Sequence, residues 1–64
     1  MSKQDAIDHA VRAARDSKET QCVFMKASRN SFADYAWGSA YSEAPKGFKP
    51  ESFVSVTGLV RVIG

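Results

Sequence analysis

Cysteine and histidine are nearly missing from this chain, which holds one of each, Cys22 and His9. With one cysteine, the chain forms no internal disulfide and offers no zinc site built from several thiolates. Neither residue has an obvious partner that would activate a nucleophile or complete a metal site. We therefore expect Cys22 to be a small buried side chain and His9 to be a solvated residue on a helix.

Motifs of catalysis are missing as well. The four glycines form no phosphate-binding loop, no nucleophile elbow is present, and the acidic residues are not arranged as a pair for acid and base catalysis. The sequence therefore predicts a protein that is not an enzyme and that holds no metal or other cofactor.

Long apolar runs and a large charge excess are also lacking. No stretch approaches the length that spans a membrane, and the N-terminus has no apolar core of the kind found in signal peptides. We expect a cytoplasmic protein with no membrane partner. The net charge of +2 and the pI of about 8.9 argue against a dedicated duplex-DNA binder, and more firmly against an acidic DNA mimic.

The length of 64 residues predicts one domain, 1–64, near the lower size limit for a self-sufficient apolar core. The stretch from Lys3 to about Asp16 contains no glycine or proline and has apolar residues at helical spacing. Ser2 and Asp5 fit the box that opens a helix. The apolar side of this predicted helix is mostly alanine, so the helix has to pack against another element.

The remaining chain predicts three strands, Gln21–Ala27, Phe32–Tyr41 and Ser52–Ile63. Residues 28–30 suit a hairpin loop, with Arg29 at its exposed tip. The predicted fold class is α+β, with one N-terminal helix packed on a three-stranded antiparallel sheet in meander order (α-β-β-β). In that order the second strand lies in the middle of the sheet.

Alternation along the second strand places Tyr35, Trp37 and Tyr41 on one face. In the third strand the valines share one parity, apart from an interruption at Gly58. We expect the valines to face the alanine side of the helix and the three rings to face away from it. The ring face then has three alternatives: the sheet curls and buries the rings, two copies stack, or the face binds a partner.

The stretch Ser42–Glu51 is a long loop for so small a domain, and long loops often carry function. Ala44–Gly47 suits a type I turn with Pro45 at its second position. Phe48 lies between two lysines and has two interpretations. It is either an anchor for a partner, flanked by charges, or a ring that folds back and closes the core.

Two function classes follow from these features. In the first, the chain is a small protein-binding module that forms a homodimer or binds a larger protein, in the way that small viral or mobile-element proteins inhibit or regulate a host protein. Tyr, Trp and Arg are residue types that dominate the energetics of interfaces. The expected partner-binding residues are Tyr35, Trp37, Tyr41, Lys46, Phe48, Lys49 and Arg61.

In the second class, the same rings stack on the bases of a single-stranded nucleic acid while basic residues hold its phosphates. These basic residues are scattered along the chain and partly offset by acidic ones. They are Lys26, Arg29, Lys46, Lys49 and Arg61. A salt-dependent mobility shift favours this class, whereas salt-insensitive association that Trp37→Ala weakens favours the first.

Overall fold

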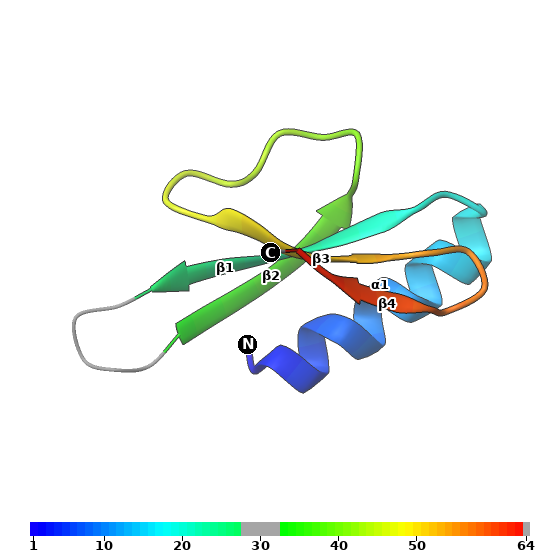
Figure 1. The fold of residues 1–64 in the computed structure, drawn as a ribbon, viewed down its shortest axis with the longest axis horizontal. Helices are drawn as coiled ribbons and strands as arrows, with labels where there is room; N and C mark the ends of the chain where they lie inside the picture. Colours follow the sequence, from blue (N-terminus) through cyan, green and yellow to red (C-terminus); the bar gives the residue numbers. More distant parts are fainter. Residues whose placement is uncertain (28–32, 64) are drawn as a thin grey trace.

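The structure is a computed structural model that describes residues 1–27 and 33–63. Within these residues the chain forms one helix followed by four strands (Figure 1). The elements are α1 (Lys3–Ser17), β1 (Gln21–Ala27), β2 (Ala33–Ser39), β3 (Lys49–Val54) and β4 (Val60–Val62). The predicted α+β class is confirmed, and the predicted number of three strands is wrong. The predicted hairpin loop with Arg29 at its tip lies outside the described residues.

Helix α1 begins where the sequence predicts it. The Asp5 amide donates to Oγ of Ser2 at 3.2 Å, which satisfies one of the donors that a first helical turn leaves free. The helix ends at Ser17, and Lys18 follows with a left-handed φ of 56°. The buried side chains of the helix are Ala6, Ala10 and Ala14.

The strand order is β2-β1-β3-β4, and each neighbouring pair is antiparallel. Strand β1 therefore lies inside the sheet and β2 at an edge, which corrects the predicted meander with Phe32–Tyr41 as its central strand. Because β2 and β3 both run antiparallel to β1, they are parallel to each other, and the chain between them has to cross to the other end of the sheet. Residues 40–48 make this crossing, on the side of the sheet away from the helix (Figure 1).

A tight turn separates β3 from β4. The Ser55 amide donates to the Leu59 carbonyl at 2.9 Å, and the Gly58 amide donates to the Ser55 carbonyl at 2.9 Å. With its φ of 86°, Gly58 closes a three-residue hairpin loop. The single strand predicted here is wrong because Val56 and Thr57, two residues with high strand propensity, lie in the turn. The predicted interruption at Gly58 is this turn.

One face of the sheet packs against α1. Val23 of β1 and Val54 of β3 are fully buried beneath the alanines, and Tyr35 of β2 packs against the same cluster. Trp37 stacks on His9 of the helix, with ring centroids 5.8 Å apart and an angle of 13° between the ring planes. The prediction that the rings face away from the helix is wrong for Tyr35 and Trp37. The register explains this placement, because Trp37 lies opposite Val23 and therefore shares its face.

The other face of β1 is covered by the crossing residues 40–48. Phe24 is 3% exposed although it alternates with Val23 and so points away from the helix. The Phe48 amide donates to the Pro45 carbonyl at 2.9 Å, and Gly47 has a φ of 85°. This turn therefore spans Pro45–Phe48, one residue later than predicted, and glycine at its third position suits type II. The long loop thus has a structural role, because it completes a second layer over β1.

Candidate protein-binding surface

Exposed apolar side chains gather on the hairpin formed by β3 and β4. Two of them are more than half exposed, Leu59 at 66% and Val62 at 64%. We call this group the β4 surface, and it consists of Phe53, Val56, Leu59, Val60, Val62 and Ile63. The register places Val60 and Val62 on the helix side of the hairpin and Phe53 on the other face, so the β4 surface borders the outer edge of β4 on both faces. Single exposed apolar residues are ordinary on a monomer, whereas several beside one open strand edge suit an interaction site.

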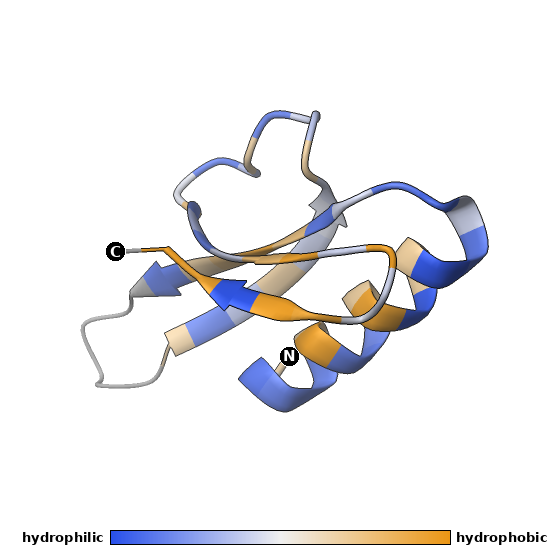
Figure 2. Cartoon of the chain, turned by 45° about the vertical axis from the view of Figure 1, so that its right-hand side comes forward, coloured by the Kyte–Doolittle hydropathy of each residue, from blue (hydrophilic) through white to orange (hydrophobic). Residues whose placement is uncertain are grey.

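The β4 surface is exposed because the helix does not extend far enough across the sheet. Helix α1 packs on β1, β2 and β3, and β4 lies beyond β3 at the edge. Val60 lies opposite Val54 in the register and so faces the helix side, yet it is 37% exposed while Val54 is fully buried. Figure 2 shows the apolar stripe of α1 facing the apolar β3–β4 hairpin. The prediction that the valines face the helix therefore holds for Val54, Val60 and Val62, but of these the helix covers only Val54, and Val56 lies in the turn.

Strand β4 also presents main-chain hydrogen-bonding groups to the outside. The Ile63 amide donates to the Glu51 carbonyl of β3 at 3.0 Å, so Ile63 directs its backbone toward β3. Alternation along an antiparallel strand then turns the N–H and C=O groups of Val60 and Val62 outward. The strand has no proline, and Arg61 is its only charged residue. Edge strands with little such protection pair with strands of other chains.

The residues predicted to bind a partner are not brought together on one surface. Tyr35 is half-buried and Trp37 is 38% exposed, both on the helix side of β2. Tyr41, which is 83% exposed, follows β2 at the start of the crossing. Arg61 lies at the opposite edge of the sheet, where its register partner is Phe53. Whether these residues contact a partner stays a prediction.

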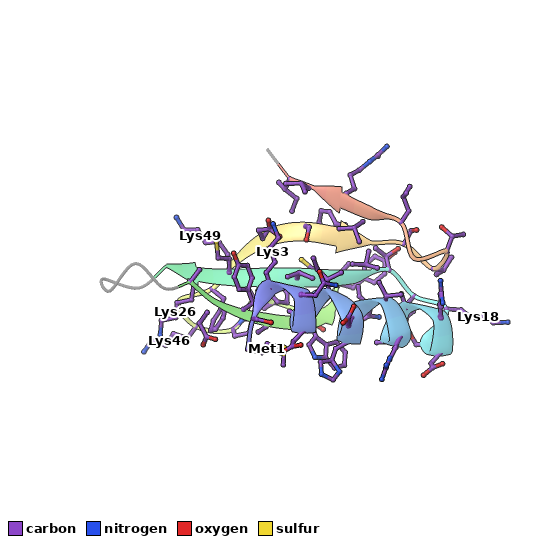
Figure 3. All side chains as sticks on the ribbon, turned by 90° about the horizontal axis from the view of Figure 1, so that it is seen from below. Met1, Lys3, Lys18, Lys26, Lys46 and Lys49 are labelled. Carbon is purple, nitrogen blue, oxygen red and sulfur yellow. The ribbon has the colours of Figure 1, made fainter. Side chains whose placement is uncertain are left out.

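Three of the residues predicted to bind a partner, Lys46, Phe48 and Lys49, lie at one end of the sheet, where β1 ends and β3 begins. Figure 3 shows Lys46 and Lys49 there together with Lys26. Nζ of Lys26 lies 6.0 Å from the centroid of the Phe48 ring. Phe48 is half-buried, and both of its interpretations stay predictions.

Sequence reasoning missed the β4 surface. It assigned the valines to the buried side of one long strand and did not single out Leu59 or Ile63. The signal that could have revealed the surface is Gly58, because a hairpin turn there folds the last residues back beside β3. A strand added beside β3 lies outside the area that one short helix covers.

Two ion pairs join the start of α1 to the sheet within residues 1–27 and 33–63. Nζ of Lys3 lies 3.1 Å from Oε1 of Glu51, and the ammonium group of Met1 lies 2.8 Å from Oδ1 of Asp34. The hydrogen bond to Glu51 raises the pKa of Lys3, and the hydrogen bond from the Met1 ammonium group lowers the pKa of Asp34. Oγ of Ser52 donates to the second oxygen of Glu51 at 2.8 Å. Both carboxylates are therefore already engaged by partners.

The part of the chain that the structure describes contains no cluster of three His, Cys, Asp or Glu side chains that could hold a metal ion, and it encloses no pocket. The Cys22 thiol is buried, and this burial raises its pKa, so its reactive thiolate form is disfavoured. Among the same residues, no helix combines the length and the apolar character needed to cross a membrane.

Comparison with known proteins provides no relative. No protein-family model, curated protein or solved structure matches the chain. A function for this chain therefore has to follow from its own residues and their geometry.

Proposed function

We propose that this chain is a small non-enzymatic protein-binding module that binds its partner by strand addition at β4. The observation that carries this proposal is that β4, an edge strand, exposes both its outer main-chain groups and its apolar side chains. A partner strand would pair with the outward N–H and C=O groups of Val60 and Val62. Side chains of the partner would then cover the β4 surface.

Burial of apolar area supplies the driving force. Complete burial of a valine or leucine side chain gains about 1.5–3 kcal/mol. Since Leu59 and Val62 are each about two-thirds exposed, covering these two side chains alone is worth on the order of 3 kcal/mol before the cost of association. A chain that acts by covering an edge strand of a larger protein suits the role of an inhibitor or regulator of that protein.

A proline at position 62 tests strand addition directly. Because the Val62 N–H points away from β3, Val62→Pro removes a donor for a partner strand while leaving the donors between β3 and β4 in place. We expect the partner recovered from a lysate, measured by quantitative mass spectrometry, to fall at least about tenfold with this variant. Val62→Ala retains the N–H and shortens the side chain, so it should cause a smaller loss.

Sedimentation velocity of the purified protein over a range of concentrations distinguishes a second copy from another partner. If the partner is a second copy, the wild-type chain forms a dimer that Val62→Pro dissociates. Trp37→Ala changes an exposed aromatic residue at the opposite edge of the sheet and separates the two placements of the interface: strand addition at β4 leaves its binding unchanged, whereas weaker binding would place the partner at Trp37 as the sequence predicts. Unaltered binding by folded Val62→Pro and Leu59→Asp variants would contradict the proposal.

A further inference from the structure

The register of the β3–β4 hairpin decides which side chain of β4 a partner strand would meet most closely. Arg61 lies opposite Phe53, and the Ile63 amide donates to the Glu51 carbonyl, so the main chain of Arg61 also points toward β3. Toward a strand on its outer side, Arg61 is therefore at a non-hydrogen-bonded position. At such positions of an antiparallel pair the two Cα atoms are about 4.5 Å apart and the side chains are closest.

The positive charge of Arg61 is not neutralised within the hairpin. Arg61 is exposed and belongs to neither of the two ion pairs of residues 1–27 and 33–63. Glu51 is the only acidic residue from Lys49 to Ile63. Its two carboxylate oxygens already contact Nζ of Lys3 at 3.1 Å and Oγ of Ser52 at 2.8 Å. A partner strand at the outer edge of β4 therefore meets a guanidinium group that has no carboxylate partner among the described residues.

This charge disfavours a second copy of the chain as the partner. A twofold axis that pairs the outward groups of Val60 with those of Val62 in the second copy sets the two Arg61 side chains directly opposite each other. Like charges at opposite positions destabilise a pair of strands. Sliding the second copy by two residues separates the arginines, but it leaves only one hydrogen-bonded pair within β4 instead of two.

We infer that the partner of β4 is an edge strand of another protein in which an aspartate or glutamate has an apolar residue on each side. The acidic side chain pairs with Arg61 on the face of the sheet away from the helix, which Arg61 shares with Phe53. The two apolar side chains lie opposite Val60 and Val62 on the helix side, where both valines are exposed. The inference rests on strand addition at β4 and names the sequence that this strand selects, because alternate side chains give strand addition its specificity.

Nuclear magnetic resonance titration of the isotope-labelled protein with short capped peptides tests the inference. The peptides have the sequence Thr-Thr-Val-X-Val-Thr-Thr, with glutamate, glutamine or lysine as X. An opposite-charge pair across two strands is worth up to about fivefold in affinity, and a like-charge pair costs a similar factor. We expect the glutamate peptide to bind about tenfold more tightly than the lysine peptide, with the glutamine peptide between them. Arg61→Glu should reverse this order, and added salt should reduce the difference.

Arg12→Gln is the matched control. Arg12 is exposed and lies one helical turn after His9, which stacks on Trp37 of β2, so this variant removes a positive charge far from β4 and should keep the order of the peptides. Equal affinities for the glutamate and lysine peptides, with binding that Val62→Pro abolishes, would overturn the inference and leave strand addition in place.

Two other results would also overturn the inference. No binding of any peptide, or binding that Val62→Pro leaves unchanged, would overturn strand addition together with it. A dimer of the purified chain that Val62→Pro dissociates would retain strand addition but show that a second copy occupies the edge of β4 despite the opposed arginines.

Discussion

Gly58 and Gly38 differ in whether their backbone conformation and their neighbours would tolerate a side chain. Gly58 has a φ of 86°, and a Cβ atom there would lie 3.1 Å from Nη2 of Arg15 on the helix. At Gly38 a Cβ atom would meet the Phe24 ring at 3.5 Å, an ordinary van der Waals contact. The turn between β3 and β4 therefore requires glycine, whereas β2 does not.

We expect Gly58→Ala to lower the free energy of unfolding by about 1–2 kcal/mol, because the new methyl group is held at a left-handed φ and crowds Arg15. Urea denaturation followed by Trp37 fluorescence measures this loss. Gly38→Ala is the matched control and should change the free energy by less than about 0.5 kcal/mol. Similar values for the two variants would contradict the left-handed conformation of Gly58.

The thiol of Cys22 provides a second test at the scale of a residue. Burial raises its pKa, so the folded state disfavours the thiolate. Its contribution to stability is therefore complete below the ordinary pKa of about 8.5 and declines as the pH rises above that value. We expect iodoacetamide at alkaline pH to alkylate the folded protein at least about tenfold more slowly than the unfolded protein.

A cysteine at an exposed position shows that the reagent itself is not limiting. Ser42→Cys, introduced together with Cys22→Ala, places the thiol at an exposed site of the crossing. This thiol should react at similar rates with and without urea. If native Cys22 reacted as fast as this control, the crossing would not cover β1.

At the scale of elements, local pattern was sufficient for α1 and β1. Ser2 and Asp5 predict the helix start, and Gln21–Ala27 is the strand that the apolar run predicts, with the same bounds. The C-terminal hairpin was not predicted, because Val56 and Thr57 favour strands and only the left-handed φ of Gly58 places them in a turn. The strand propensity of Val56 and Thr57 was therefore outweighed by the pairing of β4 with β3.

The sequence left the structural role of the crossing, residues 40–48, open. The burial of Phe24 provides a test of that role. Phe24 is 3% exposed beneath residues 40–48, while Phe53 of β3 lies on the same face and is 38% exposed. We expect Phe24→Leu to cost about 1–2 kcal/mol of unfolding free energy, since complete truncation of a buried phenylalanine costs about 3–5. Thermal and urea denaturation measure the loss.

Phe53→Leu is the matched control, because it makes the same change beside the crossing instead of beneath it. It should cost less than half as much, since a partly exposed ring loses less burial when it is shortened. Equal costs at the two positions would mean that the crossing does not form a second layer over β1.

At the scale of the whole molecule, the order of the strands could not be predicted from the sequence. Both a meander and the observed β2-β1-β3-β4 order satisfy the same alternation within each strand, because alternation is local and pairing is not. The difference decides which strand lies inside the sheet. In the observed order β1 is the strand paired on both sides and β2 is an edge strand, so the Tyr35 and Trp37 main chain is open on its outer side, whereas in a meander β3 would cover it.

Amide hydrogen exchange distinguishes the two orders in solution. The Ala40 amide donates to the Thr20 carbonyl at 3.1 Å, so alternation directs the Gly38 amide toward β1 and the Trp37 amide to the outer edge of the sheet. We expect the Trp37 amide to exchange at least about a hundredfold faster than the Gly38 amide. The amides of β1, which is paired on both sides, should be the slowest. In a meander β2 would be paired on both sides, and equal protection of Trp37 and Gly38 would show that order instead. In that order β1 would be an edge strand and its amides would not be the slowest, while β4 would remain at the other edge beside β3.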